Sequence, residues 1–175
     1  DTASHSTYRP VAVYASDVNG DGITELPRAV LMAGYKDTSS SDAVYMLDWY
    51  AYGIGKVPTK VATTYQNISD AWSLLIDQKW HDRITAIKAN DGGLSYVEFF
   101  EYRKNKMSIP LFNIYCATGS NREYYAERTD LIQLGQTTQA IYFAKLTNEG
   151  EQSELALTGD EIKARFSLVN QAWNN

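Results

Sequence analysis

The sequence predicts an α+β protein, with an antiparallel four-stranded meander over residues 11–66 and an antiparallel sheet covered by two helices over residues 67–175. Three observations support this class. Short apolar runs alternate with dense turn signals along most of the chain. Two capping-box patterns in the second part predict helix starts. Aromatic residues make up 13% of the chain, and such side chains are enriched in strands. Residues 1–10 form a polar leader.

The meander is predicted from four apolar runs that end at turn signals. A cluster of Asp, Asn and Gly residues closes the first run, and Pro27 marks the start or the edge of the second. The sequence from Gly53 to Lys56 joins the last two runs as a hairpin turn. The four predicted strands are 11–15, 26–35, 44–52 and 57–66.

The second part contains six more strand candidates. The turn from Asn90 to Gly93 predicts a hairpin between two of them. The continuous apolar run at 109–117 predicts a central strand that is buried on both faces. The six predicted strands are 71–76, 84–89, 94–102, 109–117, 131–134 and 140–146.

Two helices are expected to cover this second sheet. Ser120 with Glu123 opens a short helix that runs to about Thr129, and Thr158 with Glu161 caps a C-terminal helix. The apolar residues of the C-terminal helix are spaced four, three and four apart, which predicts one helical stripe packed on the sheet. These residues are Ile162, Phe166, Val169 and Trp173.

The composition excludes several classes of function. Lys and Arg number 16 against 21 Asp and Glu, a formal net charge of -5. Without a basic stripe, neither nucleic-acid binding nor binding of the domain as a whole to anionic membranes is expected. No apolar stretch approaches the roughly 20 residues that cross a bilayer, so no transmembrane segment is expected. Abundant Tyr, Asn, Ser and Thr with a single cysteine, Cys116, is typical of secreted bacterial surface proteins. We therefore expect an extracellular or cell-envelope location.

One motif indicates a metal-binding site, and it is a nine-residue loop that begins at Asp17. Oxygen-bearing side chains stand at its first, third, fifth and ninth positions, and a backbone carbonyl would serve at the seventh. Gly22, at the sixth position, allows a sharp turn. Calcium binds six to eight oxygens, and alternate positions of a tight loop direct theirs inward. The predicted ligands of a structural Ca²⁺ ion are Asp17, Asn19, Asp21, Ile23 and Glu25.

The loop is not an EF-hand, because its twelfth position, where a bidentate glutamate belongs, is Arg28. Its three carboxylates would repel one another without a divalent cation between them. Calcium is preferred to magnesium because no phosphate-binding motif accompanies the loop. The alternative interpretation is a metal-free turn in which the Asp and Asn side chains bind their own backbone.

The loop spacing resembles the calcium loop of integrin-type FG-GAP repeats, Asp-x-Asp/Asn-x-Asp-Gly-x-x-Asp, with Glu25 in place of the last Asp. Each repeat of that family is one four-stranded propeller blade, so the resemblance implies a blade-like meander over residues 11–66. One blade cannot close a propeller, so its faces are expected to pack on the rest of the chain.

Residues after about 70 resemble the PsbP-like domain of secreted bacterial lipoproteins. The segment from Trp72 to Trp80 is similar to that family's opening, with Asp77 where proline is usual. The apolar run at 111–115, the strand at 141–144 and the C-terminal helix follow in the family's order. The resemblance implies an α-β-α sandwich in a cell-envelope protein without established catalytic residues, with a lipid anchor outside this sequence.

The sequence thus predicts a non-catalytic, calcium-stabilised extracellular module of a bacterial cell-surface lipoprotein, with an unidentified glycan or protein ligand. Most aromatic residues are expected to pack between the two units. The candidates for an exposed ligand-binding face are Tyr50, Tyr52, Tyr124 and Tyr125. The alternative is an extracellular glycan hydrolase that uses two paired carboxylates. The candidate carboxylates are Glu98, Glu101, Glu123, Glu127 and Asp130.

Overall fold

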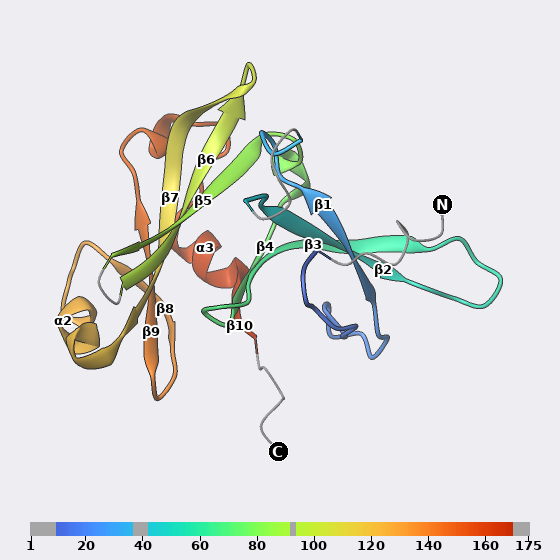
Figure 1. The fold of residues 1–175 in the computed structure, drawn as a ribbon, viewed down its shortest axis with the longest axis horizontal. Helices are drawn as coiled ribbons and strands as arrows, with labels where there is room; N and C mark the ends of the chain where they lie inside the picture. The colour runs from blue at the N-terminus through green and yellow to red at the C-terminus, as the bar shows by residue number, and fades with distance from the viewer. Residues whose placement is uncertain (1–9, 37–41, 92–93, 170–175) are drawn as a thin grey trace.

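The computed structural model describes residues 10–36, 42–91 and 94–169, and in these ranges the chain is mainly β (Figure 1). Strands account for 49% and helices for 13% of the structure. The strands form two antiparallel sheets of five strands each. The two α-helices of the described ranges are only five and seven residues long. The predicted α+β class, with two helices covering a sheet in an α-β-α sandwich, is therefore wrong.

The first sheet has the strand order β1-β2-β3-β4-β10. Strands β1 to β4 follow one another in the chain as antiparallel neighbours, whereas β10 comes from the C-terminal end and pairs with β4. The sheet therefore continues without a break past residue 66. Its strands are β1 (Leu26–Leu31), β2 (Tyr45–Ala51), β3 (Thr59–Asn67), β4 (Trp72–Leu75) and β10 (Phe166–Leu168).

The strand predicted at 11–15 does not form, so the predicted four-stranded meander over 11–66 has three strands. In this segment the Val13 N–H donates to the Val11 carbonyl at 3.0 Å. Only Ser16, which follows, makes an isolated β-bridge, and its partner is Glu25. The segment therefore adds no strand to the edge at β1.

The second sheet has the order β5-β6-β7-β9-β8. Strand β7 pairs with both β6 and β9, which confirms the central strand predicted from the apolar run at 109–117. Strand β9 matches its predicted range residue for residue. The strands are β5 (Ile84–Asp91), β6 (Leu94–Arg103), β7 (Lys106–Thr118), β8 (Ile132–Gln136) and β9 (Ala140–Leu146).

The C-terminal helix is shorter than its apolar spacing predicts. Helix α3 (Gly159–Arg165) ends where the chain extends into β10, while α2 (Arg122–Ala126) occupies the centre of the predicted short helix. Phe166 lies on β10, and the Val169 N–H donates to a backbone carbonyl at Ala71. Beyond Ile162 the predicted helical stripe is therefore strand, and its last member, Trp173, lies outside the described residues.

The capping box that opens α3 forms as predicted. The Glu161 N–H donates to the Thr158 hydroxyl at 3.2 Å, and the Thr158 N–H donates to a Glu161 carboxylate oxygen at 2.7 Å. Glu161 also has a lowered pKa, first because it accepts this backbone N–H.

Replacing Thr158 by alanine is expected to lower the free energy of unfolding by about 1 kcal/mol, because a backbone donor of α3 loses its acceptor. For a chain of this size that corresponds to roughly 2–4 °C in melting temperature. Thermal unfolding followed by circular dichroism measures the change. Thr158→Ser keeps the hydroxyl and should melt like the wild type. Equal melting of all three proteins would contradict a stabilising cap.

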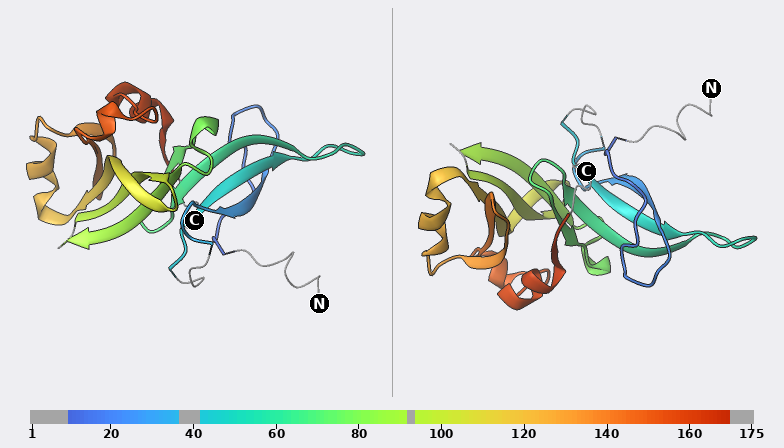
Figure 2. Two further views of the ribbon diagram at one scale, coloured as in Figure 1. Left: turned by 90° about the horizontal axis from the view of Figure 1, so that it is seen from above. Right: turned by 90° about the horizontal axis from the view of Figure 1, so that it is seen from below.

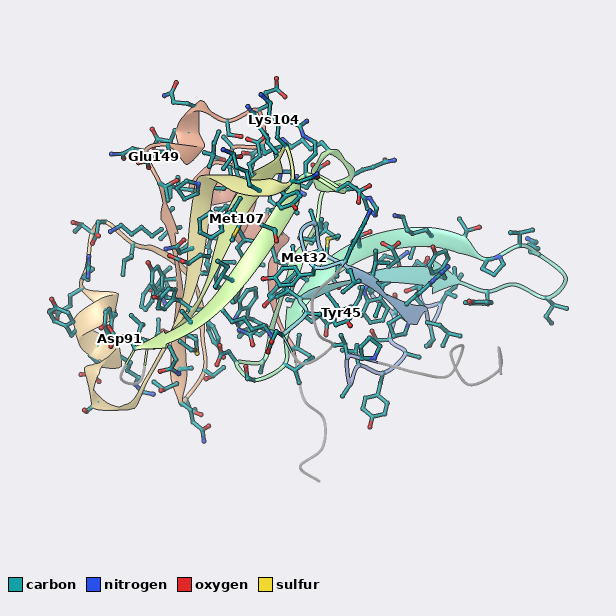
Figure 3. All side chains as sticks on the ribbon, turned by 45° about the horizontal axis from the view of Figure 1, so that its top comes forward. Met32, Tyr45, Asp91, Lys104, Met107 and Glu149 are labelled. Atoms are coloured by element: carbon teal, nitrogen blue, oxygen red, sulfur yellow. The ribbon has the colours of Figure 1, made fainter. Side chains whose placement is uncertain are left out.

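The two sheets share one hydrophobic core. The β4 end of the first sheet packs on the second sheet, while the β2–β3 hairpin extends away from it (Figures 1 and 2). Tyr65 of β3 meets Phe99 of β6 edge-on, with ring centroids 5.4 Å apart. The Tyr35 hydroxyl donates to the Ala86 carbonyl at 2.6 Å. Met32, labelled in Figure 3, is buried in the same core. Aromatic side chains such as Tyr35, Tyr65 and Phe99 thus join the two sheets.

Candidate metal centre

The acidic loop that begins at Asp17 is closed at its two ends by a β-bridge. The Glu25 N–H donates to the Ser16 carbonyl at 2.9 Å, and the Ser16 N–H donates to the Glu25 carbonyl at 3.2 Å. Inside the loop, Gly20 and Gly22 have φ values of 77° and 84°. Residues with side chains rarely adopt this left-handed conformation. The backbone itself therefore explains the glycine at the sixth position of the motif.

Asp17 organises the turn by accepting three backbone N–H groups. Its Oδ1 accepts from Gly20 at 2.7 Å and from Asp21 at 3.1 Å, and its Oδ2 accepts from Gly22 at 2.8 Å. These bonds, with that of Gly22 first, lower the pKa of Asp17. A carboxylate has about four acceptor positions, so Asp17 keeps capacity for one more ligand.

Asn19 and Asp21 are exposed and are bonded to one another. The Asn19 side-chain amide donates to the Asp21 Oδ2 at 2.9 Å, and the Asp21 N–H donates to the Asn19 Oδ1 at 3.1 Å. The N–H of Ile23 donates to the Asp21 Oδ1 at 2.8 Å. These are the local bonds that the metal-free interpretation predicts.

Glu25 differs from the other predicted ligands because its side chain is fully buried. Its Oε2 accepts the Val18 N–H at 2.9 Å, which directs the carboxylate back into the loop. Its Oε1 is buried without a hydrogen-bond partner among the described residues. Leaving a buried carboxylate oxygen unpaired costs more free energy than a lost neutral hydrogen bond. Such an oxygen, at the closing position of an acidic loop, fits a metal ligand.

The five predicted ligand residues lie in one loop, which the Ser16–Glu25 bridge closes. Within the described ranges, no three His, Cys, Asp or Glu side chains converge as a metal cluster. The carboxylates of Asp17 and Asp21 instead accept N–H groups of the loop itself. These carboxylates and the Asn19 amide oxygen each keep further acceptor positions, which a cation could use.

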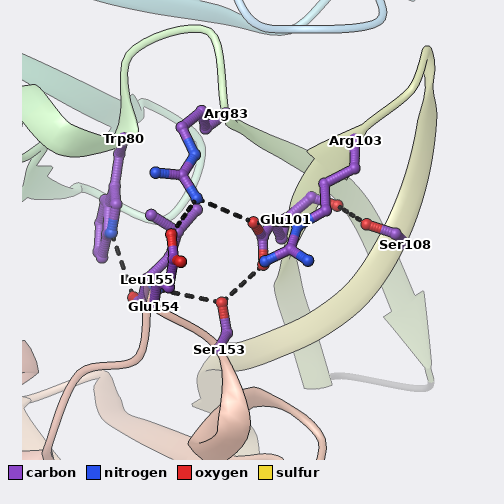
Figure 4. A network of polar contacts seen from close by, with 8 residues as sticks. All are labelled: Trp80, Arg83, Glu101, Arg103, Ser108, Ser153, Glu154 and Leu155. Atoms are coloured by element: carbon purple, nitrogen blue, oxygen red, sulfur yellow. Dashed lines mark hydrogen bonds and ion pairs between the residues drawn. The ribbon is translucent and has the colours of Figure 1, made fainter.

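A second polar centre surrounds Glu101, whose side chain is fully buried on β6 (Figure 4). Its Oε1 accepts from Arg103 Nε at 2.5 Å and from Arg83 Nη2 at 3.3 Å. Its Oε2 accepts from the Ser153 hydroxyl at 2.6 Å, and this hydroxyl accepts the Leu155 N–H at 3.0 Å. The network thus fastens the segment that precedes α3 to the second sheet.

Hydrogen bonding and burial shift the pKa of Glu101 in opposite directions. Burial raises the pKa of this carboxyl, but the hydrogen bonds from Arg103, Ser153 and Arg83 outweigh it and leave the pKa lowered. Both carboxylate oxygens are therefore occupied by donors in the ionised state. Alternation along β6 could have revealed this position from sequence, because Val97, Phe99 and Glu101 occupy every second residue and are all buried.

The other candidate carboxylates of the hydrolase hypothesis have separate surroundings. Glu98 lies on the opposite face of β6 from Glu101 and accepts from the Asn113 amide at 3.4 Å. Asp130 pairs with Arg128 at 2.6 Å, and the hydrogen bond from Arg128 is the first cause that lowers its pKa to about 2. The remaining two candidates, Glu123 and Glu127, are exposed in and beside α2.

The four candidate tyrosines do not form one ligand-binding face. Tyr52 and Tyr124 are 56% and 65% exposed, whereas Tyr50 is half-buried. Tyr125 packs against the small apolar cluster beneath α2. Helix α2 and the β2–β3 hairpin lie at opposite ends of the molecule (Figure 1). Any stacking role would therefore involve Tyr52 or Tyr124 separately.

The single cysteine is also described by the structure. Cys116 is buried on β7, and burial is the first cause that raises the pKa of its thiol to about 11. A thiol with such a pKa is protonated and unreactive at neutral pH.

Comparison with protein-family models, with curated proteins and with solved structures gives no match for this chain. The FG-GAP and PsbP-like resemblances therefore stay predictions from sequence motifs. In the described parts of the chain, no helix combines the length and the apolarity needed to cross a membrane.

Proposed function

We propose that this chain is a non-catalytic, calcium-stabilised extracellular module of a bacterial cell-surface lipoprotein, with a glycan or protein ligand. The observation that carries the calcium proposal is the buried, unpartnered Oε1 of Glu25 at the end of the acidic loop. A divalent cation would satisfy this oxygen and reduce the repulsion among the three carboxylates of the loop.

The oxygens that would hold the ion belong to five residues of the loop. They are the side chains of Asp17, Asn19, Asp21 and Glu25, and the carbonyl of Ile23. Calcium would supply charge neutralisation at this point. The chain's own contribution is to anchor the loop, because the Ser16–Glu25 bridge joins it to the start of β1. Stabilising the loop would therefore stabilise an edge of the first sheet.

The extracellular assignment is supported by the kind of site that the loop offers. Asn19 and Asp21, two of the proposed ligands, are exposed to solvent. Such exposure favours weak binding, and extracellular calcium modules typically bind in the range of about 0.1–1 mM. Tyr124, which is 65% exposed on α2, is the side chain best placed to contact a glycan or protein.

Calcium added to EDTA-treated protein is expected to raise the melting temperature. At ten times the dissociation constant, a ligand of the folded state stabilises it by about 1.4 kcal/mol, or roughly 3–6 °C here. Asp21→Ala should abolish this increase while leaving the metal-free melting temperature nearly unchanged, because Asp21 is exposed. The measurement is thermal unfolding across a calcium titration.

Glu127→Ala removes an exposed carboxylate outside the loop and serves as the matched control, which should respond to calcium like the wild type. An Asp21→Ala response equal to that of the wild type, or no effect of calcium on the wild type, would refute the metal site. Magnesium at the same concentrations tests the preference for calcium.

A further inference from the structure

The β2–β3 hairpin is an exposed arm that ends in a tight turn. All ten residues from 52 to 61 are exposed, and the arm projects beyond the rest of the molecule in Figures 1 and 2. At its end the Lys56 N–H donates to the Gly53 carbonyl at 3.1 Å, and Gly55 has a φ of 69°. This turn sets the shape of the tip.

The tip combines apolar and basic side chains. Ile54 is fully exposed and Val57 is 86% exposed, although a branched aliphatic side chain is normally buried. Lys56 stands between them, and Tyr52 precedes them. Residues 49–69 contain two lysines and no acidic residue, in a chain with a net charge of -5. The hairpin as a whole also contains Asp48, which pairs with Lys60, so its net positive charge comes from Lys56 near the tip.

We infer that the tip of this hairpin inserts into the surface of an anionic lipid bilayer. Ile54 and Val57 would enter the boundary of the acyl chains, and Tyr52 suits the headgroup level, where tyrosine is enriched. Lys56 would meet lipid phosphates, since basic residues at an anionic surface add about 1 kcal/mol each. Lys60 contributes less, because it is paired with Asp48 at 3.3 Å.

A bilayer suits this tip better than a protein partner does. A stable protein interface buries about 800 Å² on each side, which a few side chains at one turn do not supply. Membrane binding, in contrast, has no minimum interface area, and its strength scales with the apolar area buried plus the attraction to anionic lipid, so this tip predicts weak, reversible binding. The arm also holds the acidic body away from the lipid. About three residues beyond the last strand pair span roughly 10 Å, which is one Debye length at 0.1 M salt.

Co-sedimentation with phosphatidylcholine vesicles that contain about 30% phosphatidylglycerol tests the inference, because anionic lipid attracts basic residues. The wild type should bind, and the double variant Ile54→Ser/Val57→Ser should bind at least about tenfold more weakly. Lys56→Glu should weaken binding roughly tenfold on these vesicles and little on pure phosphatidylcholine. Measuring with EDTA present makes the result independent of the calcium proposal.

Met107→Ser provides a matched control, because Met107 is 47% exposed near the β6–β7 turn, far from the arm (Figure 3). This variant should bind like the wild type. Tyr52→Trp gives a second measurement, since its fluorescence should shift to the blue and be quenched by brominated lipid. Trp49, Trp72 and Trp80 are buried and should respond little. Absence of wild-type binding, or equal binding by the double variant, would overturn the inference.

Discussion

Replacing Trp72 by alanine is expected to lower the free energy of unfolding by about 3–5 kcal/mol, the usual cost of removing a large aromatic side chain from a core. Trp72 is fully buried where the first sheet meets the second. Its ring lies 5.4 Å from that of Tyr65 and 5.9 Å from that of Phe166. The substitution would leave a cavity between β3 and β10.

Urea denaturation measures this change, with unfolding followed by far-ultraviolet circular dichroism. The indole Nε1 is buried without a partner among the described residues, so losing it offsets a small part of the cost. Leu75→Ala on the same strand is the control, because Leu75 is 42% exposed and should cost under about 1 kcal/mol. Similar losses for the two variants would show that Trp72 is not central to the shared core.

Glu101→Gln is expected to cost about 2–3 kcal/mol at neutral pH. Breaking a buried ion pair typically costs about 3–5 kcal/mol, but Arg83 and Arg103 are 41% and 47% exposed in their side chains. Water can therefore solvate these two cations when the carboxylate is lost. The glutamine amide would also place a donor near the arginines, where only acceptors are useful.

The same substitution should remove part of the acid sensitivity of the protein. The pKa of Glu101 is lower in the folded state than the ordinary value of 4.5. Its stabilisation is complete above the pKa of the unfolded state and is lost as the pH falls through the folded pKa. The difference in stability between wild type and Glu101→Gln should therefore shrink below about pH 4.

Urea denaturation at pH 7 and at pH 3 measures both effects. Glu98→Gln on the opposite face of β6 is the matched control and should have a small effect at either pH. A difference between wild type and Glu101→Gln that is the same at the two pH values would contradict the role assigned to the ionised carboxylate.

The strands were largely predictable because hairpins are local. Turns and apolar runs are determined by residues that are adjacent in the sequence, and β9 (Ala140–Leu146) matches its predicted range. The class of the fold was not predictable in this way. Phe166 stands four residues after Ile162, a helical spacing, yet it pairs with Leu74 on β4. A partner so distant in sequence leaves no local signal, so tertiary pairing overrides the helical pattern there.

In the candidate site, too, local features were predictable from the sequence and long-range contacts were not. The spacing of Asp17, Asn19 and Asp21 predicts an oxygen-lined turn, and the structure holds these residues in one turn. Glu25 is fully buried and bridges to Ser16, and the spacing of the motif reveals neither feature. Glu101 was a candidate for catalysis. Its two partners are Arg103, at the end of the same strand, and Arg83, in the turn before β5.

The position of β10 has a consequence for the order in which the molecule folds during synthesis. Phe166 pairs with Leu74 across about 90 residues of chain, and these intervening residues include the whole second sheet. Until β10 (Phe166–Leu168) has been synthesised, β4 is an open edge beside an incomplete core, and such edges favour aggregation. The first sheet, although begun first, is therefore the last to be completed.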